Sequence, residues 1–166
     1  MSKEKTAIVW FTNNLRVSDN STLSLALKNH TRVICVYCFN KSTFEGSFYS
    51  FKRISKYRTK FLIESVSNLK INLEAKNISL FVYYGQPEKK LSELFVSLKA
   101  GFLYVQKETT KEENELINTV ENSLPRNVII KKIFDQFLIH PNLLDFNREK
   151  KLKSFSSFRK RVEKIK

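Results

Sequence analysis

Val9-Trp10-Phe11-Thr12-Asn13-Asn14-Leu15-Arg16-Val17-Ser18-Asp19-Asn20 is the stretch that decides the fold. An apolar run that begins at Ala7 and ends at Phe11 is typical of a short buried strand. A polar turn follows, and then three side chains, Ser18-Asp19-Asn20, that commonly cap helices. The apolar spacing beyond them predicts a helix over residues 19–29. A strand, a loop and a helix in this order open an α/β sheet, whose ligands bind at the carboxyl ends of the strands.

The rest of the chain repeats this alternation. Val-, Ile- and aromatic-rich segments predict strands over residues 6–11, 32–39, 79–84, 101–105 and 127–133. Helices are predicted between them, the longest over residues 52–76. Its apolar stripe consists of Ile54, Tyr57, Phe61, Val66, Leu69 and Leu73. The expected fold is α/β: a Rossmann-like, doubly wound, five-stranded parallel sheet in a single domain, with the first strand at its centre.

Length and composition limit the possibilities further. The 166 residues suit one domain, and a hydrophobic content of 42% is enough for a core. We assign residues 1–134 to the α/β domain and residues 135–166 to a basic C-terminal extension. No apolar run approaches the roughly 20 residues of a membrane span. The N-terminus shows no signal-peptide pattern, so we expect a cytoplasmic protein without a membrane partner.

The two cysteines have the spacing Cys35-x-x-Cys38, which in other contexts indicates a redox or zinc site. Here they lie in a predicted buried strand, where residues three apart face opposite sides of the sheet. No second pair of potential metal ligands accompanies them. We therefore expect structural cysteines. The chain has only three glycines, which excludes a glycine-rich phosphate loop or dinucleotide fingerprint.

The net charge of +14 is uneven, because the last 36 residues carry eleven Lys/Arg against four Asp/Glu. Such a tail fits weak, non-specific binding to nucleic-acid phosphates. It fits equally well a solubilising surface or a linker face, and the sequence leaves both open. The nucleic-acid candidates are Lys150, Lys151, Lys153, Arg159, Lys160 and Arg161.

The opening stretch resembles the first strand and loop of the DNA photolyase/cryptochrome family, whose pattern is Trp-Phe-Arg-x-Asp-Leu-Arg-x-x-Asp-Asn. The matching residues are Trp10, Phe11, Leu15, Arg16, Asp19 and Asn20. Thr12 stands in place of the family arginine, and Asn14 in place of the family aspartate. One positive and one negative charge are lost together, which indicates a lost ion pair rather than a different fold.

The resemblance continues along nearly the whole chain. Residues 58–69 match a family helix, and residues 84–88 match its Gly-x-Pro-Glu turn. The Lys107-Glu108-Thr109 stretch, with two glutamates behind it, resembles the DASH-type cryptochromes in particular, as does the segment over residues 155–163. In full-length members a second, helical domain follows and binds the catalytic FAD and the damaged DNA. The resemblance thus implies that FAD is not bound by this chain alone, and that a separately encoded flavin-binding photolyase domain is a possible partner.

Candidate site residues follow from the resemblance and from the strand ends. In the family, the residues matching Glu108 and Lys107 line the site of a folate antenna, methenyltetrahydrofolate. A carboxylate suits the paired N–H donors of an aminopterin. The alternative is that Glu108 is a loop acid that stabilises a helix N-terminus. Asn13, Phe39 and Asn40 end the first two strands beside the same crevice, where ordinary loop roles are the alternative. No catalytic triad and no metal-ligand spacing is present.

Two functions remain open. The first is the antenna-binding half of a light-driven FAD flavoprotein acting on DNA, without repair activity of its own. The second is a stand-alone module that binds a nucleotide-like ligand, or nucleic acid through its basic tail. The first requires a bound chromophore, which an absorption spectrum of the purified protein would detect.

Overall fold

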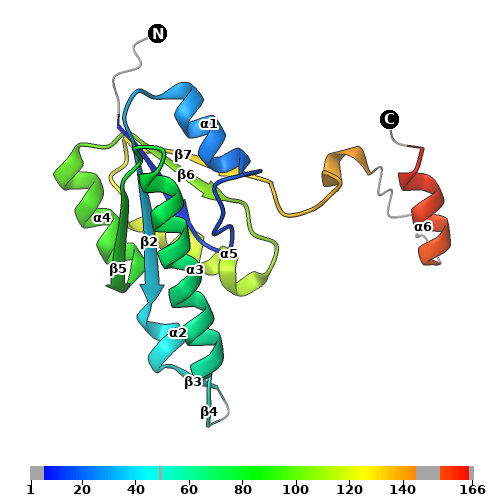
Figure 1. Cartoon of the computed structure of the whole chain (residues 1–166), viewed down its shortest axis with the longest axis horizontal. Coiled ribbons are helices and arrows are strands. Elements are labelled where there is room, and N and C mark those ends of the chain that lie inside the picture. Colours follow the sequence, from blue (N-terminus) through cyan, green and yellow to red (C-terminus); the bar gives the residue numbers. More distant parts are fainter. Residues whose placement is uncertain (1–5, 49, 145–153, 165–166) are drawn as a thin grey trace. The chain divides into compact units, whose positions relative to one another are not determined.

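The computed structural model describes residues 6–48, 50–144 and 154–164. They group into two compact units, Met1–Asp135 and Gln136–Lys166. The first unit contains a five-stranded parallel sheet in the order β5-β2-β1-β6-β7 (Figure 1). Its strands are β1 (Ala7–Phe11), β2 (Val33–Asn40), β5 (Leu80–Gly85), β6 (Phe102–Gln106) and β7 (Ile129–Ile133). The predicted α/β fold and the central position of the first strand are confirmed.

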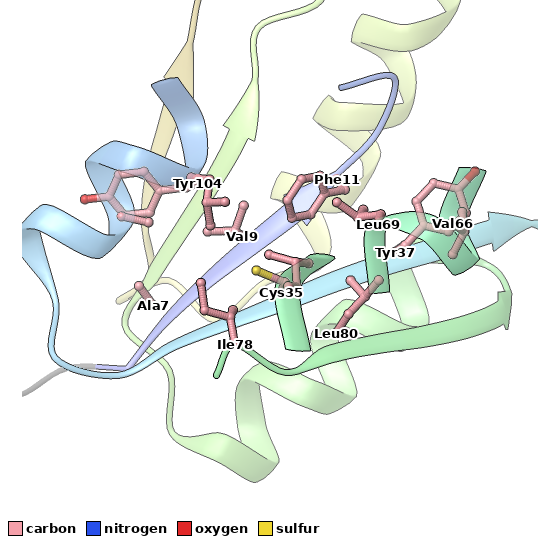
Figure 2. Close-up of a cluster of buried hydrophobic side chains, with 13 residues drawn as sticks. Ala7, Val9, Phe11, Cys35, Tyr37, Val66, Leu69, Ile78, Leu80 and Tyr104 are labelled. Carbon is pink, nitrogen blue, oxygen red and sulfur yellow. The ribbon is translucent and has the colours of Figure 1, made fainter. Parts of the chain in front are cut away.

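All five residues of β1 are buried, as expected for a strand with a parallel neighbour on each side and helices on both faces. Trp10 lies opposite Val36 of β2 and Val105 of β6. On one face of the sheet pack α1 (Ser21–Asn29) and α3 (Lys56–Glu74). Figure 2 shows this cluster, in which Phe11 of β1 lies beside Leu69 of α3. On the other face pack α4 (Pro87–Leu98) and α5 (Lys111–Ser123).

The prediction for the longest helix was partly wrong. The helix α3 begins at Lys56 rather than at residue 52. Ile54 is buried but lies before the start of the helix. Of the predicted stripe, Val66, Leu69 and Leu73 face the core, whereas Tyr57 and Phe61 are exposed. The core contact is carried by the later turns of α3. Its first turns extend beside the helix formed by residues 41–45 (Figure 1).

The segment between the second predicted strand and the longest predicted helix, interpreted from its sequence as a polar and aromatic loop over residues 40–50, contains regular structure. It forms the short helix α2 (Lys41–Glu45) and β3 (Ser47–Phe48), which pairs with β4 (Phe51–Lys52) in a hairpin. Asn40 starts α2, because its side-chain oxygen accepts from the Ser42 backbone N–H at 3.1 Å. Gly46 ends it, and its backbone leaves no room for a Cβ beside the Ser42 carbonyl. The capping residue Asn40 and the terminating residue Gly46 are single residues in a polar segment. Such residues are also common in loops, so the sequence alone did not indicate a helix here.

The second unit contains a 3-10 turn, η1 (Pro141–Leu143), and the helix α6 (Phe155–Val162). Arg159, Lys160 and Arg161 lie on α6, and Arg159 pairs with Glu163 at 3.2 Å. Lys150, Lys151 and Lys153 lie outside the described residues. Among the helices that the structure describes, none has both the length and the apolar character needed to cross a membrane.

Both cysteines are buried and carry free thiols. Burial raises the pKa of Cys35 to about 12 and that of Cys38 to about 11, so both thiols are protonated at neutral pH. The thiolate is the reactive form of cysteine. The expectation of structural rather than redox-active cysteines is therefore supported by the fold.

Alkylation tests this property directly. In the folded protein at about pH 8, iodoacetamide should modify neither thiol, because each is inaccessible and its raised pKa suppresses the thiolate. Unfolding in guanidinium restores an ordinary pKa and access, so both cysteines should then react, as read by mass spectrometry. Modification of the folded protein at the rate of a free cysteine would contradict this account.

Candidate functional site

Glu108 follows β6 by two residues and is only 3% exposed. Its Oε1 accepts a hydrogen bond from Thr12 Oγ1 at 2.8 Å and another from Gln106 Nε2 at 3.2 Å. Asn13 Nδ2 lies 3.4 Å from the same oxygen. Thr12 and Asn13 directly follow β1, the neighbour of β6. The structure therefore brings two predicted site residues, Glu108 and Asn13, together at the carboxyl ends of adjacent strands.

A second carboxylate joins this group. Asn13 Nδ2 donates to Glu113 Oε1 at 2.5 Å, and Thr110 Oγ1 donates to Glu113 Oε2 at 2.6 Å. Thr110 is also the N-cap of α5, and its hydroxyl accepts from the Glu113 backbone N–H at 3.4 Å. Asn114 Nδ2 donates a hydrogen bond to the backbone carbonyl of Glu108 at 3.1 Å. The exposed Asn13 amide thus bridges a buried carboxylate and a more accessible one.

The two departures from the family pattern lie next to each other in this group. The Thr12 backbone N–H donates to Asn14 Oδ1 at 3.2 Å, and the Thr12 hydroxyl donates to Glu108. Asn14 is buried, and its Nδ2 has no hydrogen-bond partner among the described residues. Neutral side chains at positions 12 and 14 therefore keep a short polar network here, and Thr12 supplies Glu108 with an uncharged donor.

The other three predicted residues are not hydrogen-bonded to Glu108 in the described network. Lys107 is exposed, and its backbone N–H pairs with the Ile133 carbonyl at 2.7 Å. Phe39 is half-buried, with ring contacts to Tyr37 at 4.9 Å and Phe44 at 5.7 Å. Asn40 caps α2. In this structure Phe39 and Asn40 thus have packing and capping roles at the end of β2.

Sequence reasoning missed Thr12, Gln106 and Glu113 as members of the site. Thr12 stands out in the sequence only as a departure from the family pattern. Gln106 and Glu113 could have been predicted from the sequence, because both lie within five residues of Glu108. Gln106 is also a polar residue at the end of a buried strand, and ligands bind near the ends of such strands. Thr110 and Glu113 have the spacing of a capping box, in which the N-cap hydroxyl accepts from the backbone N–H three residues later. That hydrogen bond is present, whereas the Glu113 carboxylate accepts from the Thr110 hydroxyl.

Arg16 has a structural role. Its Nη2 lies 3.7 Å from Asp135 Oδ2. The same Asp135 carboxylate accepts from the backbone N–H and the hydroxyl of Ser21 at 2.7 and 2.9 Å, and so covers the N-terminus of α1. Asn20 is the N-cap residue, accepting from the Leu23 N–H at 3.0 Å. The interactions of Asp135 with Arg16 and Ser21 therefore connect the start of α1 to the residues that follow β7.

A groove of about 560 Å³ lies elsewhere, between the loop after β1 and the later turns of α3. It does not include Glu108. It is lined by Leu15, Arg16, Val17, Ser18, Ser65, Asn68, Asn72, Ala75 and Lys76. Within the described residues, no group of three or more His, Cys, Asp and Glu side chains is arranged to hold a metal ion.

Comparison with known proteins identifies the family to which this chain belongs. The sequence profile of the DNA photolyase family matches residues 7–166. The chain belongs to that family. Among its relatives are a cryptochrome DASH from Gloeobacter violaceus, 34% identical over 96% of this chain, and the blue-light photoreceptor PHR2 from Arabidopsis thaliana, 33% identical over 97%. The predicted resemblance to photolyases and DASH-type cryptochromes is confirmed.

Solved structures agree with the fold. The cryptochrome of Synechocystis sp. PCC6803 superposes on 96% of this chain with a TM-score of 0.88 at 31% identity. A photolyase from the archaeon Sulfolobus tokodaii covers 97% with a TM-score of 0.78 at 28% identity. The chain spans about a third of the length of these relatives, between 32% and 36%. The similarity therefore concerns their N-terminal α/β domain.

Proposed function

We propose that this chain is the antenna-binding part of a light-driven FAD flavoprotein that acts on DNA. The observation that carries the proposal is the position of Glu108, a buried carboxylate held at the meeting point of β1 and β6. In a parallel sheet this edge is where ligands bind. Membership of the photolyase family supplies the class of ligand, a light-harvesting chromophore.

The chromophore that we propose is methenyltetrahydrofolate. Its pterin edge presents neighbouring N–H groups, and a carboxylate has about four acceptor sites, so Glu108 can retain Thr12 and still accept from a ligand. Glu108 is almost fully buried, and the exposed Asn13 amide lies 3.4 Å from its Oε1, so we expect a bound pterin to displace Asn13 from Glu108. Lys107 then lies beside the site. This chain offers one wall of the pocket, so we expect weak binding.

A different ligand is the alternative. The structure of the Sulfolobus tokodaii photolyase is described as holding two FAD molecules and as implying a novel light-harvesting cofactor. That protein shares the domain described here, with a TM-score of 0.78. A second flavin, or another nucleotide-like ligand, at the carboxyl ends of β1, β2 and β6 is therefore the competing proposal. Phe39 at the end of β2 offers a ring for stacking in that case.

Ligand titration distinguishes these proposals. Methenyltetrahydrofolate and FAD would each be titrated into the purified chain and followed by fluorescence. Glu108→Gln should weaken folate binding roughly 10- to 100-fold, because hydrogen bonds to a charged acceptor are worth about 1.5–3 kcal/mol. Glu115→Gln on the exposed face of α5 is the matched control and should bind normally.

Circular dichroism of each variant would show that the fold is intact. If folate binds equally well to Glu108→Gln and to the parent chain, Glu108 does not hold the pterin. If FAD binds and folate does not, the flavin alternative replaces the folate proposal.

Two partner proposals accompany this function. One is a separately encoded flavin-binding domain of the photolyase type, which would complete the enzyme. The other is weak, non-specific contact of DNA phosphates with the basic tail, including Arg159, Lys160 and Arg161 on α6. The tail contact should fall steeply with salt concentration.

A further inference from the structure

The two edge strands of the parallel sheet differ in their side chains. β5 forms one edge, beside β2, and β7 forms the other (Figure 1). An edge strand offers unpaired backbone groups to other strands, and proteins commonly protect it with lysine, proline or a bulge. β7 carries two exposed lysines, Lys131 and Lys132, at its middle. β5 has the sequence Leu-Phe-Val-Tyr-Tyr-Gly, so it lacks both charge and proline.

Three side chains of β5 are exposed to solvent. Phe81 and Val82 are each 41% exposed, and Tyr84 is 53% exposed. The strand is nevertheless an ordinary member of the sheet, because Val82 is the register partner of Tyr37 in β2. The Tyr84 hydroxyl donates to Glu45 Oε1 at 2.6 Å, which fixes the direction of the Tyr84 ring. β5 therefore presents an ordered apolar strip at the edge of the sheet.

The pairing of β5 with β2 decides which backbone groups of β5 face outward. The Cys35 N–H donates to the Ser79 carbonyl at 3.0 Å, and Cys35 is the register partner of Leu80. Residues along a strand alternate in the direction of their N–H and C=O groups. Leu80, Val82 and Tyr84 therefore direct these groups away from β2. Within the described residues, none of these outward groups has a hydrogen-bond partner.

We propose that two copies of this chain associate through β5, so that their two sheets form one continuous sheet. The two strands run antiparallel about a two-fold axis, with Val82 opposite the same residue of the second copy. Leu80 then lies opposite the second copy's Tyr84, and every outward N–H and C=O of the paired residues finds a partner. On the other face of the sheet, Phe81 lies opposite the second copy's Tyr83.

The sequence of β5 favours a second copy as the occupant of this edge. Aromatic and β-branched side chains opposite each other stabilise antiparallel strands, and two-fold symmetry produces the Phe81–Tyr83 pair twice. Like charges directly opposite each other would destabilise the pairing, but the paired segment contains no charge. The β5 strand is thus complementary to itself. Association leaves Glu108 accessible, because β2 and β1 lie between β5 and β6.

The net charge of the chain gives the association a characteristic salt dependence. Each copy carries a charge of +14, so two copies repel each other at low ionic strength. Added salt screens this repulsion, whereas it hardly affects apolar contacts and backbone hydrogen bonds in the sheet. We therefore expect the dimer to become stronger as the salt concentration rises. Binding of phosphates by the basic tail would show the opposite dependence.

Sedimentation equilibrium of the full chain, over a wide range of protein concentrations and at several salt concentrations, tests the proposal. The parent should reach twice its monomer mass. Val82→Lys places two ammonium groups opposite each other across the axis and should raise the dissociation constant roughly 10- to 100-fold. Val82→Pro removes the outward N–H at the centre of the pairing, and an edge strand tolerates proline there. It should weaken the dimer roughly 5- to 100-fold.

Ile129→Lys is the matched control. Ile129 is a β-branched residue, 46% exposed, on β7 at the opposite edge of the sheet. This variant adds the same charge as Val82→Lys and should dimerise as the parent does. Circular dichroism of all three variants would show that the fold is intact.

Hydrogen exchange locates the contact. The outward amides of Leu80, Val82 and Tyr84 should exchange rapidly in the dilute parent and slowly in the concentrated parent. The amides of Phe81 and Tyr83, which face β2, serve as an internal reference and should be protected at every concentration. In Val82→Lys, the concentration dependence at Leu80 and Tyr84 should disappear.

A parent chain that stays monomeric at all concentrations would overturn the proposal, even if its β5 edge accepted an added extended peptide. A dimer of unchanged strength in both Val82 variants would also overturn it, because another surface would then join the copies. A failure of folate binding at Glu108 does not affect this proposal, since the β5 edge and the Glu108 group share no residue.

Discussion

Replacing Trp10 by alanine should lower the free energy of unfolding by about 3–5 kcal/mol, the usual range for a large aromatic residue removed from a core. Trp10 is 2% exposed in the central strand, opposite Val36 and Val105. It packs in the cluster between the sheet and the helices α4 and α5. A domain of this size has a total stability of only about 5–15 kcal/mol, so the variant should be close to unfolding.

Urea unfolding followed by far-ultraviolet circular dichroism measures this effect. Fluorescence is unsuitable, because Trp10 is the only tryptophan of the chain. Tyr57→Ala is the matched control: it also removes an aromatic ring, but an exposed one, and should change stability by no more than about 0.5 kcal/mol. Similar losses in both variants would mean that the core does not lie where the structure places it.

This contrast also shows what sequence reasoning captured of the fold. The buried run in β1 and its neighbours in β2 and β6 were predicted because parallel central strands are apolar along their whole length. The exposed rings of α3 were misassigned because Tyr57 and Phe61 fit a helical period as well as Val66 and Leu69 do. Only the length of the sheet beneath the helix decides which turns meet the core, and that length is a property of the tertiary structure.

The candidate site was predictable to a similar degree. The end of a strand identified Glu108 and Asn13, and the structure joins them through Thr12 and Gln106. The sequence could not show that the Glu108 carboxylate is buried under neutral donors, because burial depends on the loop after β1 folding across the end of β6. The capping role of Asn40 was not predicted, because the helix that it caps, α2, is only five residues long.

Blue light should leave pyrimidine dimers intact when this chain alone is supplied with FAD and dimer-containing DNA. Photorepair requires an excited flavin within electron-transfer reach of the lesion, and a protein contributes by holding the cofactor there. The resemblance to photolyases implies that the flavin is held by a helical domain, whereas this sequence matches only about a third of its relatives. An antenna chromophore at Glu108 would absorb light without an acceptor for its energy.

Adding a separately encoded flavin domain should give measurable repair of the dimers, which the chain alone does not repair. The dependence of repair on wavelength then distinguishes the roles of the two chains. Near-ultraviolet light absorbed by the folate should drive repair through the antenna, whereas longer blue light excites the flavin directly. Glu108→Gln should therefore reduce repair at the folate wavelength and leave it unchanged at the flavin wavelength, with Glu115→Gln behaving as the parent at both. Repair by this chain alone would refute the proposed division of labour. Equal repair by Glu108→Gln at both wavelengths would refute the antenna role while leaving the two-chain enzyme intact.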